Sequence, residues 1–275
     1  MPNIDVKGSL LGQGNTAEIF EWGSDKILKL YRHGLSGDLC VNEFEMTIYA
    51  NEYLKIAPKP VELVNIDGRT GAIYERINGE TMLKLMLSKP WRINQYSKML
   101  ARCHAAMQKP VTHHAITVKE KLKRDIEGVQ LLSPGEKHVI YQYLETLPDG
   151  DIICHFDFHP DNIMISSGQY WVIDWMTGCI GDPLSDIART SLILNYAEIP
   201  RVSAIVSVLF RMLQKNIYQK YIREYIKLTG ANLSDIHKWD LPLAAARLCE
   251  WVPDGESRKL VILIKKMLNN LPEQK

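Results

Sequence analysis

The chain has few of the features that mark secreted, membrane-spanning or nucleic-acid-binding proteins. Its five cysteines are scattered and odd in number, with no C-x-x-C pair, which argues against a disulfide or zinc framework. Its 33 basic and 32 acidic residues leave a net charge of +1, so no field of one sign favours nucleic acid or a membrane surface. No apolar run is long enough to span a bilayer, and the N-terminus lacks the basic-then-apolar order of a signal peptide. We therefore expect a cytoplasmic globular protein; the sequence predicts no oligomeric state.

The 275 residues, 46% of them hydrophobic, can bury a substantial core or form two lobes that share a cleft. Turn signals and β-branched or aromatic runs predict strands over residues 18–22, 26–31, 61–64 and 71–77. A helix is predicted over 40–53, ended by Pro58 and Pro60. Helical spacing dominates afterwards, for example over 92–107, interrupted by strands near 152–153 and 170–173. The predicted fold class is α+β, with a small sheet lobe over 1–77, a hinge at about 75–80, and a larger helical lobe over 78–275.

The most informative segment is His155-Phe-Asp-Phe-His-Pro-Asp-Asn162, which lies between two apolar, strand-like runs. Twelve residues beyond Asn162, another apolar run leads to Asp174. This is the order and approximate spacing of a kinase catalytic loop followed by its metal-binding aspartate. An acceptor hydroxyl needs a carboxylate to orient it and take its proton, a role that Asp157 can fill. Mg²⁺ prefers oxygen ligands, which Asn162 and Asp174 can supply.

These motifs, with Ile173-Asp-Trp175 and Gly181-Asp-Pro-Leu-Ser-Asp186, resemble the aminoglycoside phosphotransferase and choline kinase superfamily over nearly the whole chain. The resemblance implies a two-lobed, protein-kinase-like fold with an antiparallel sheet and one main helix in the small lobe. It also implies supporting roles for His155 and Asp182 in bracing the loop. His159 stands where protein kinases carry a lysine and could approach the transferred phosphate. Phe156 departs from the pattern, because family members usually carry glycine or a small residue there.

The same resemblance assigns a nucleotide site to the N-terminal lobe. Gly12 to Ile19 fits a phosphate-covering loop, whose glycines allow backbone N–H groups to approach phosphate oxygens. Lys29 shares a strand face with Ile27 and Tyr31 by period two, an unusual position unless its ammonium has an anionic target. The family supplies one in the α- and β-phosphates, with Glu43 as the favoured pairing carboxylate and Glu45 as the alternative. The nucleotide contacts predicted here are Gly12, Gly14, Asn15, Thr16, Lys29 and Glu43.

The segment Tyr74-Glu-Arg-Ile-Asn-Gly79 occupies the family's hinge. The expected contacts with the purine are the Glu75 carbonyl and the Ile77 N–H. Tyr74 would then stand behind the purine, where its bulk could narrow the pocket. ATP is the default nucleotide, GTP stays open as an alternative, and Mg²⁺ is the expected metal.

The acceptor is left open by the sequence. The C-terminal helices offer acidic and aromatic residues that suit a cationic acceptor, such as an aminoglycoside or an amino alcohol of the choline or thiamine type; they are Asp235, Trp239, Asp240, Glu250, Trp251, Asp254 and Glu256. Two other functions remain as alternatives. A protein Ser/Thr kinase is opposed by the short connection from Asp174 to Asp182 and by the lack of an Ala-Pro-Glu segment. A catalytically silent nucleotide-binding module is opposed by the competent residue at every expected position.

Overall fold

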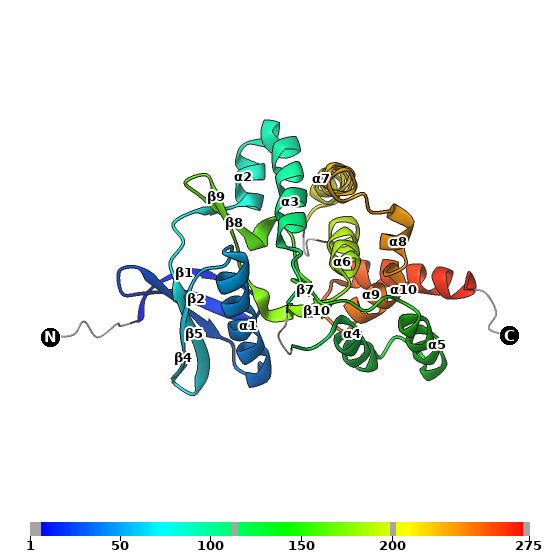
Figure 1. Cartoon of the computed structure of the whole chain (residues 1–275), viewed down its shortest axis with the longest axis horizontal. Coiled ribbons are helices and arrows are strands. Elements are labelled where there is room, and N and C mark those ends of the chain that lie inside the picture. Colours follow the sequence, from blue (N-terminus) through cyan, green and yellow to red (C-terminus); the bar gives the residue numbers. More distant parts are fainter. Residues whose placement is uncertain (1–6, 112–114, 199–201, 272–275) are drawn as a thin grey trace. The chain divides into compact units, whose positions relative to one another are not determined.

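The computed structural model describes residues 7–111, 115–198 and 202–271, and these residues form two compact units (Figure 1). The first unit contains residues 1–88 and 160–178, and the second contains 89–159 and 179–275. The first unit thus takes its last part from the middle of the chain, because the hairpin within 160–178 packs with residues near 80. The predicted functional lobes, 1–77 and 78–275, are a different partition and stay a prediction.

The first unit is built around a five-stranded antiparallel sheet in the order β1-β2-β3-β5-β4. Its strands are β1 (Lys7–Gln13), β2 (Ala17–Trp22), β3 (Lys26–Tyr31), β4 (Pro60–Ile66) and β5 (Arg69–Glu75). Along β3, Leu28 and Leu30 pack on one face with Ile73, whereas Ile27 and Tyr31 belong to the cluster on the other face. The alternation confirms the predicted strand over 26–31 and places Lys29 on the same face as Ile27 and Tyr31.

The main helix of this unit, α1 (Gly37–Tyr49), is capped by the Ser36 hydroxyl, which accepts from the Asp38 N–H. A π-helical turn (Ala50–Leu54) continues it, and the left-handed Lys55, at φ 58°, ends it before either proline is reached. The predicted helix therefore has the right place, but a left-handed residue ends it and the prolines do not.

A second, three-stranded sheet completes the first unit, in the order β6-β8-β9. It consists of β6 (Glu80–Thr81), β8 (Ile163–Ser166) and β9 (Gln169–Val172), and the short α2 (Met82–Ser88) follows β6. A 3₁₀ turn (Pro160–Asn162) precedes β8, and another (Trp175–Thr177) follows β9. Gly79 allows the close approach of this sheet, because a Cβ there would lie 2.5 Å from the Ile165 carbonyl oxygen.

The second unit is mostly helical, with one two-stranded ladder of β7 (Ile152–Cys154) and β10 (Cys179–Gly181). The central helix α6 is buried on nearly every face from Ser185 to Leu194. The helices of this unit are α3 (Ile93–Met107), α4 (Val118–Glu127), α5 (Pro134–Glu145), α6 (Pro183–Tyr196), α7 (Ala204–Thr229), α8 (Leu233–His237), α9 (Asp240–Arg247) and α10 (Asp254–Asn269). Within the described residues, no helix combines the length and apolarity needed to cross a bilayer.

Candidate active site

A glycine-containing turn joins β1 to β2 in the first unit. The Gly14 N–H donates to the Ala17 carbonyl at 2.8 Å, and Arg32 donates to the Gly14 carbonyl through Nε and Nη2 at 3.1 and 3.0 Å. A Cβ at Gly12 would meet no protein atom within 4 Å. Neither Gly12 nor Gly14 has positive φ. The chain's own packing and backbone therefore do not require glycine here, and close approach of a bound group is the remaining physical reason for it.

Lys29 lies at the centre of a buried ion-pair network in the same unit. Its Nζ donates to Glu43 Oε1 at 2.5 Å and to Asp174 Oδ1 at 2.9 Å. Tyr31 donates to the second oxygen of Glu43 at 3.0 Å. The alternative partner, Glu45, is exposed on the other side of α1. Burial alone would lower the pKa of Lys29, but Asp174 and Glu43 raise it by more, so its net pKa is raised and the lysine stays charged.

Asp174 and Asn162 flank the open end of the β8-β9 hairpin. The register pairs Ile163 with Val172, and the Ile173 N–H donates to the Asn162 carbonyl at 3.0 Å. Asp174 itself is left-handed, at φ 65° and ψ 62°. The hairpin thus brings one amide and one carboxylate side chain to the same end. Among the described residues no cluster of three or more His, Cys, Asp and Glu forms a metal cage. An amide oxygen and a carboxylate nevertheless fit Mg²⁺, which often takes its other ligands from phosphates and water.

A cavity of about 530 Å³ lies within the first unit. Apart from Asn15, every predicted nucleotide contact lines it, as do Tyr74 and Asp174; the predicted residues among its lining are Gly12, Gly14, Thr16, Lys29, Glu43, Glu75 and Ile77. Asn15 is exposed at the tip of the turn. The cavity walls also include Ala17, Ile19, Ile27 and Ile173, which offer an apolar surface. Such a cavity combines apolar walls with a few convergent polar groups, as small-molecule sites do.

The segment 76–79, which follows β5, lines this cavity. The Ile77 N–H donates to no other described residue, whereas the neighbouring Arg76 N–H donates to the Asp25 carbonyl at 2.8 Å. Tyr74 is 5% exposed, and its hydroxyl, close to Tyr31 and Thr47, makes no hydrogen bond of ordinary geometry within the described residues. Tyr74 and Ile77 thus both line the cavity, and each carries a hydrogen-bond donor with no partner among the described residues.

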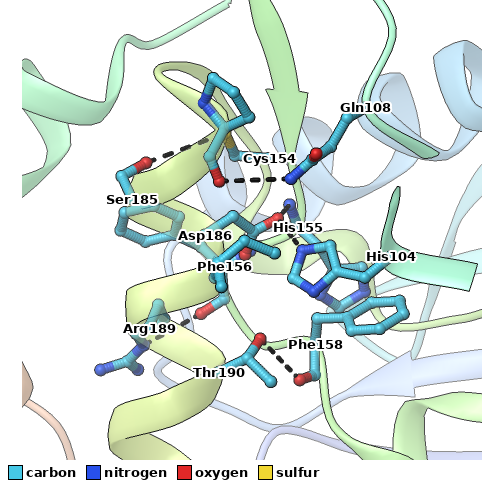
Figure 2. Close-up of polar contacts among 12 residues, drawn as sticks. His104, Gln108, Cys154, His155, Phe156, Phe158, Ser185, Asp186, Arg189 and Thr190 are labelled. Carbon is cyan, nitrogen blue, oxygen red and sulfur yellow. Dashed lines mark hydrogen bonds and ion pairs between the residues drawn. The ribbon is translucent and has the colours of Figure 1, made fainter. Parts of the chain in front are cut away.

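In the second unit, Asp186 holds the loop that carries Asp157. Figure 2 shows its carboxylate reaching the loop from α6, where it accepts from the His155 N–H at 2.7 Å and the Phe156 N–H at 2.9 Å. His104 Nε2 lies 3.1 Å from the same carboxylate, and its Nδ1 lies 2.7 Å from the Tyr221 hydroxyl. Burial raises the pKa of Asp186, but His104 and the loop N–H groups lower it more, so the carboxylate is ionised.

Phe156 adopts a left-handed conformation, with φ 64°, and its ring is buried. Glycine has no steric penalty at such φ, which agrees with the small residue that the family resemblance led us to expect at this place. Here Asp186 holds the N–H of Phe156, and Arg189 Nε donates to its carbonyl at 3.0 Å (Figure 2). These bonds and the burial of the ring hold the bulky residue in this conformation.

Asp157 is partly exposed, and its N–H donates to His155 Nδ1 at 3.2 Å. His159 Nε2 lies 3.4 Å from Asp157 Oδ2. Burial raises the pKa of Asp157, but His159, Arg189 and His155 outweigh it and hold the pKa below its usual value. Asp157 is therefore a carboxylate at neutral pH, as a group that orients a hydroxyl must be.

Asp182, predicted to brace the loop, caps α6 by accepting from the Leu184 N–H at 3.0 Å and also accepts from Trp239 Nε1 at 3.1 Å. Asp186, Arg189 and Thr190 on α6 all bond to the loop backbone, Thr190 by donating from its hydroxyl to the Phe158 carbonyl at 2.9 Å, and none of the three was singled out as a site residue from the sequence. A signal for Asp186 existed, because it ends the Gly-Asp-Pro-x-x-Asp run. Arg189 carried no such signal, because it is one of several polar residues in the sequence of α6.

Comparison with known proteins decides the family. The profile of the phosphotransferase enzyme family matches residues 9–221. The chain belongs to this family. A search of curated proteins finds no match.

Solved structures share the fold at low sequence identity. The streptomycin–ATP–APH(2″)-IIa ternary complex has a TM-score of 0.59 and 16% identity, over 95% of this chain and 92% of that one. The GDP complex of aminoglycoside 2′-phosphotransferase-IIIa has a TM-score of 0.57 and 15% identity, over 98% and 96%. A choline/ethanolamine kinase family protein from Mesorhizobium loti has a TM-score of 0.56 and 16% identity, over 97% and 82%. These likenesses confirm the predicted α+β, kinase-like fold.

Proposed function

We propose that this phosphotransferase is a small-molecule kinase, which transfers the γ-phosphate of ATP or GTP to an acceptor hydroxyl in a Mg²⁺-dependent reaction. The observation that carries the proposal is the cavity lined by the glycine turn, by Lys29 with both of its carboxylates, and by the Ile77 segment. A buried lysine whose charge is fixed by two carboxylates and that faces an open cavity suits a polyphosphate.

Within the cavity, the glycine turn would cover the phosphates and Lys29 would bind the α- and β-phosphates. Asn162 and Asp174 would hold the metal through an amide and a carboxylate oxygen. When bound there, Mg²⁺ supplies positive charge that offsets the charge of the β- and γ-phosphates. The Lys29–Asp174 contact supports this assignment, because it fixes the carboxylate beside the lysine that would bind the same nucleotide.

Asp157 is the proposed catalytic base. As an ionised carboxylate it can accept a hydrogen bond from the acceptor hydroxyl and take its proton as the phosphoryl group is transferred. His159, close to Asp157, would carry a positive charge toward the transferred phosphate when protonated. Asp186 and Arg189 act through the backbone of the loop and are positioning residues.

The nucleotide is the finer part of the proposal. ATP is the default, and its amino group would donate to the Glu75 carbonyl. The Tyr74 hydroxyl and the Ile77 N–H, which have no partner among the described residues, favour a second nucleotide, because both are donors that could serve the O6 acceptor of guanine. GTP is thus proposed as a usable alternative. Structures of two similar proteins contain ATP and GDP, respectively.

An assay of nucleotide turnover with a panel of candidate acceptors tests the proposal against a protein kinase and a catalytically silent module. Nucleoside diphosphate release should depend on Mg²⁺ and on one of the added acceptors, which should include aminoglycosides, choline, ethanolamine, thiamine, sugars and hydroxy acids. Transfer to serine or threonine of a protein substrate, with none to small molecules, would favour a protein kinase. Tight Mg²⁺-dependent nucleotide binding without turnover of any acceptor would favour a silent module.

A further inference from the structure

The carboxylates predicted to receive a cationic acceptor mostly have basic partners within the second unit. Asp235 accepts from Lys238 at 2.8 Å, and Asp240 lies 2.7 Å from His237 Nδ1. Trp239 is 1% exposed and donates to Asp182, so its ring faces no solvent. These residues are therefore already satisfied by the protein itself.

Glu250 is neutralised by two arginines at once. Arg189 Nη2 donates to its Oε1, and Arg247 Nη1 donates to its Oε2. Arg247 Nε also donates to Glu256 Oε1 at 2.9 Å, and the other oxygen of Glu256 accepts from the Glu198 N–H at 3.2 Å. Neither carboxylate keeps an oxygen free of a partner. An amine-rich acceptor would have to displace an arginine from a carboxylate to bind either of them.

Arg189 connects Arg247 to the loop that carries the proposed base, because both arginines donate to Glu250. Arg189 donates to the carbonyl of Phe156, the residue before Asp157, and its charge contributes to the low pKa of Asp157. Burial lowers the pKa of Arg247, but Glu250, Glu256 and, to a smaller extent, Asp157 raise it. The other groups that act on Asp157 are His155 and His159. The charged neighbours of Asp157 named here are thus cations or groups that become cations on protonation.

Each of the two guanidinium groups has one nitrogen without a hydrogen-bond partner among the described residues. Arg189 is 3% exposed, with Nε and Nη2 engaged and Nη1 without a partner among the described residues. Arg247 is pinned at Nε and Nη1, while its Nη2 has no partner in the same part of the chain. The side chain of Arg247 is 15% exposed, so it meets solvent. A guanidinium fixed by two carboxylates has little entropy left to lose and is preorganised to bind an oxyanion.

We propose that the acceptor is a hydroxyl compound with an anionic group, such as a sugar acid or hydroxy acid, and that Arg247 binds that group. This inference rests on the proposed function, because it takes Asp157 as the group that receives the acceptor hydroxyl. Arg247 then sets the acceptor specificity, because its Nη2 group donates to the anionic group of the acceptor. Glu250, which is itself bound by Arg189, holds Arg247 in position. A polycationic acceptor is disfavoured by the same charges.

Binding of six-carbon hydroxyl compounds in three charge states tests the proposal. Gluconate, sorbitol and glucosamine are titrated calorimetrically into the protein saturated with ADP and Mg²⁺, at matched ionic strength, with kanamycin as the polycation. Gluconate should bind about tenfold more tightly than glucosamine. Tighter binding of glucosamine or kanamycin, equal binding of the three, or no binding of gluconate would overturn the proposal.

Two variants show whether Arg247 is responsible. Arg247→Lys keeps the charge but loses the planar fork, so the preference for gluconate should fall by about threefold or more, while ADP affinity stays unchanged. Arg258→Gln is the matched control, because Arg258 is exposed on α10 and contacts no described residue through a hydrogen bond or ion pair. An unchanged preference in Arg247→Lys would overturn the role of Arg247. Failure of ADP to bind the wild type, with gluconate still bound, would instead count against the proposed kinase function.

Discussion

Each unit of the molecule holds a carboxylate that is almost completely buried, Glu43 in the first and Asp186 in the second, and the two are used differently. Glu43, 2% exposed, accepts from the side chains of Lys29 and Tyr31. Asp186, 1% exposed, accepts from two backbone N–H groups of the loop that carries Asp157. Side chains can change rotamer when a ligand arrives, whereas backbone donors cannot turn away without moving the loop. The comparison indicates that Glu43 holds the lysine proposed to bind the nucleotide and that Asp186 fixes a backbone conformation.

The largest expected effect on activity comes from Asp157, on the loop that Asp186 holds. Asp157→Asn should lower kcat by about 10²- to 10⁴-fold, the usual contribution of a positioned general base, with nucleotide affinity nearly intact. Because the pKa of Asp157 is held below its usual value of 3.8, its titration should add no acid limb to the rate near neutral pH. Steady-state kinetics with the accepted substrate measure both. Turnover close to wild type would show that Asp157 is not the base.

The two buried carboxylates can be compared directly in stability. Asp186→Ala removes the acceptor of two buried N–H groups and should lower the free energy of unfolding by about 3–5 kcal/mol. Glu43→Gln keeps an acceptor for Tyr31 and should cost less, about 1–2 kcal/mol, while it weakens nucleotide binding. Urea unfolding followed by circular dichroism gives the values. The comparison fails if Glu43→Gln is the more destabilising of the two.

The ligand side of the comparison is tested through the metal. Asp174→Ala should abolish the gain in nucleotide affinity that Mg²⁺ produces, a loss of about tenfold or more. Lys29→Ala should weaken nucleotide binding even without metal, because it removes the cation that faces the phosphates. Calorimetric titrations with and without Mg²⁺ separate the two effects. Wild-type affinity of Asp174→Ala in the presence of Mg²⁺ would contradict its assignment as a ligand.

Two glycines of the first unit separate binding from packing. Gly12→Ala meets no protein atom and should change stability by less than about 0.5 kcal/mol, but it should weaken nucleotide binding. Gly79→Ala places a Cβ 2.5 Å from the Ile165 carbonyl oxygen and should destabilise the unit by about 1–3 kcal/mol. Thermal unfolding and nucleotide titration are measured on both. Unchanged nucleotide affinity in Gly12→Ala would show that the turn between β1 and β2 is not part of the nucleotide site.

The smallest expected effect concerns Tyr74. Tyr74→Phe removes a hydroxyl that has no hydrogen-bond partner in the described residues, so stability should change little. The ratio of GTP to ATP affinity should fall, and Tyr74→Ala should change it further by widening the cavity. Competition of the two nucleotides in one binding assay measures the ratio. A constant ratio across both variants would make Tyr74 a core residue only.

Much of this arrangement follows from local sequence patterns. Period-two spacing was enough to predict the strand over 26–31 and the face of Lys29, and the loop motif was enough to single out Asp157, Asn162 and Asp174. The strand β1 was not predicted, because its residues 7–13 are mostly exposed and lack an apolar alternation. The end of α1 was assigned to the wrong residues, since left-handed Lys55 has no marker as clear as proline.

Long-range pairing was the part that local patterns could not provide. Asp186 lies 31 residues from the His155 N–H that it holds, and Arg189 lies 61 residues from Glu250. The acidic residues of the C-terminal helices suggested a cationic acceptor only while their partners were unknown. Because Arg189 and Arg247 both donate to Glu250, this part of the molecule instead favours the anionic acceptor that we propose.

The bonds from Asp186 have a consequence for amide hydrogen exchange. The N–H groups of His155 and Phe156 are both buried and both donate to one carboxylate, so neither can meet solvent catalyst while the loop is held. Their deuteration rates should therefore track the opening of the second unit and ignore the fluctuations of nearby surface turns. The exchange rates of these two amides therefore report how often the loop opens.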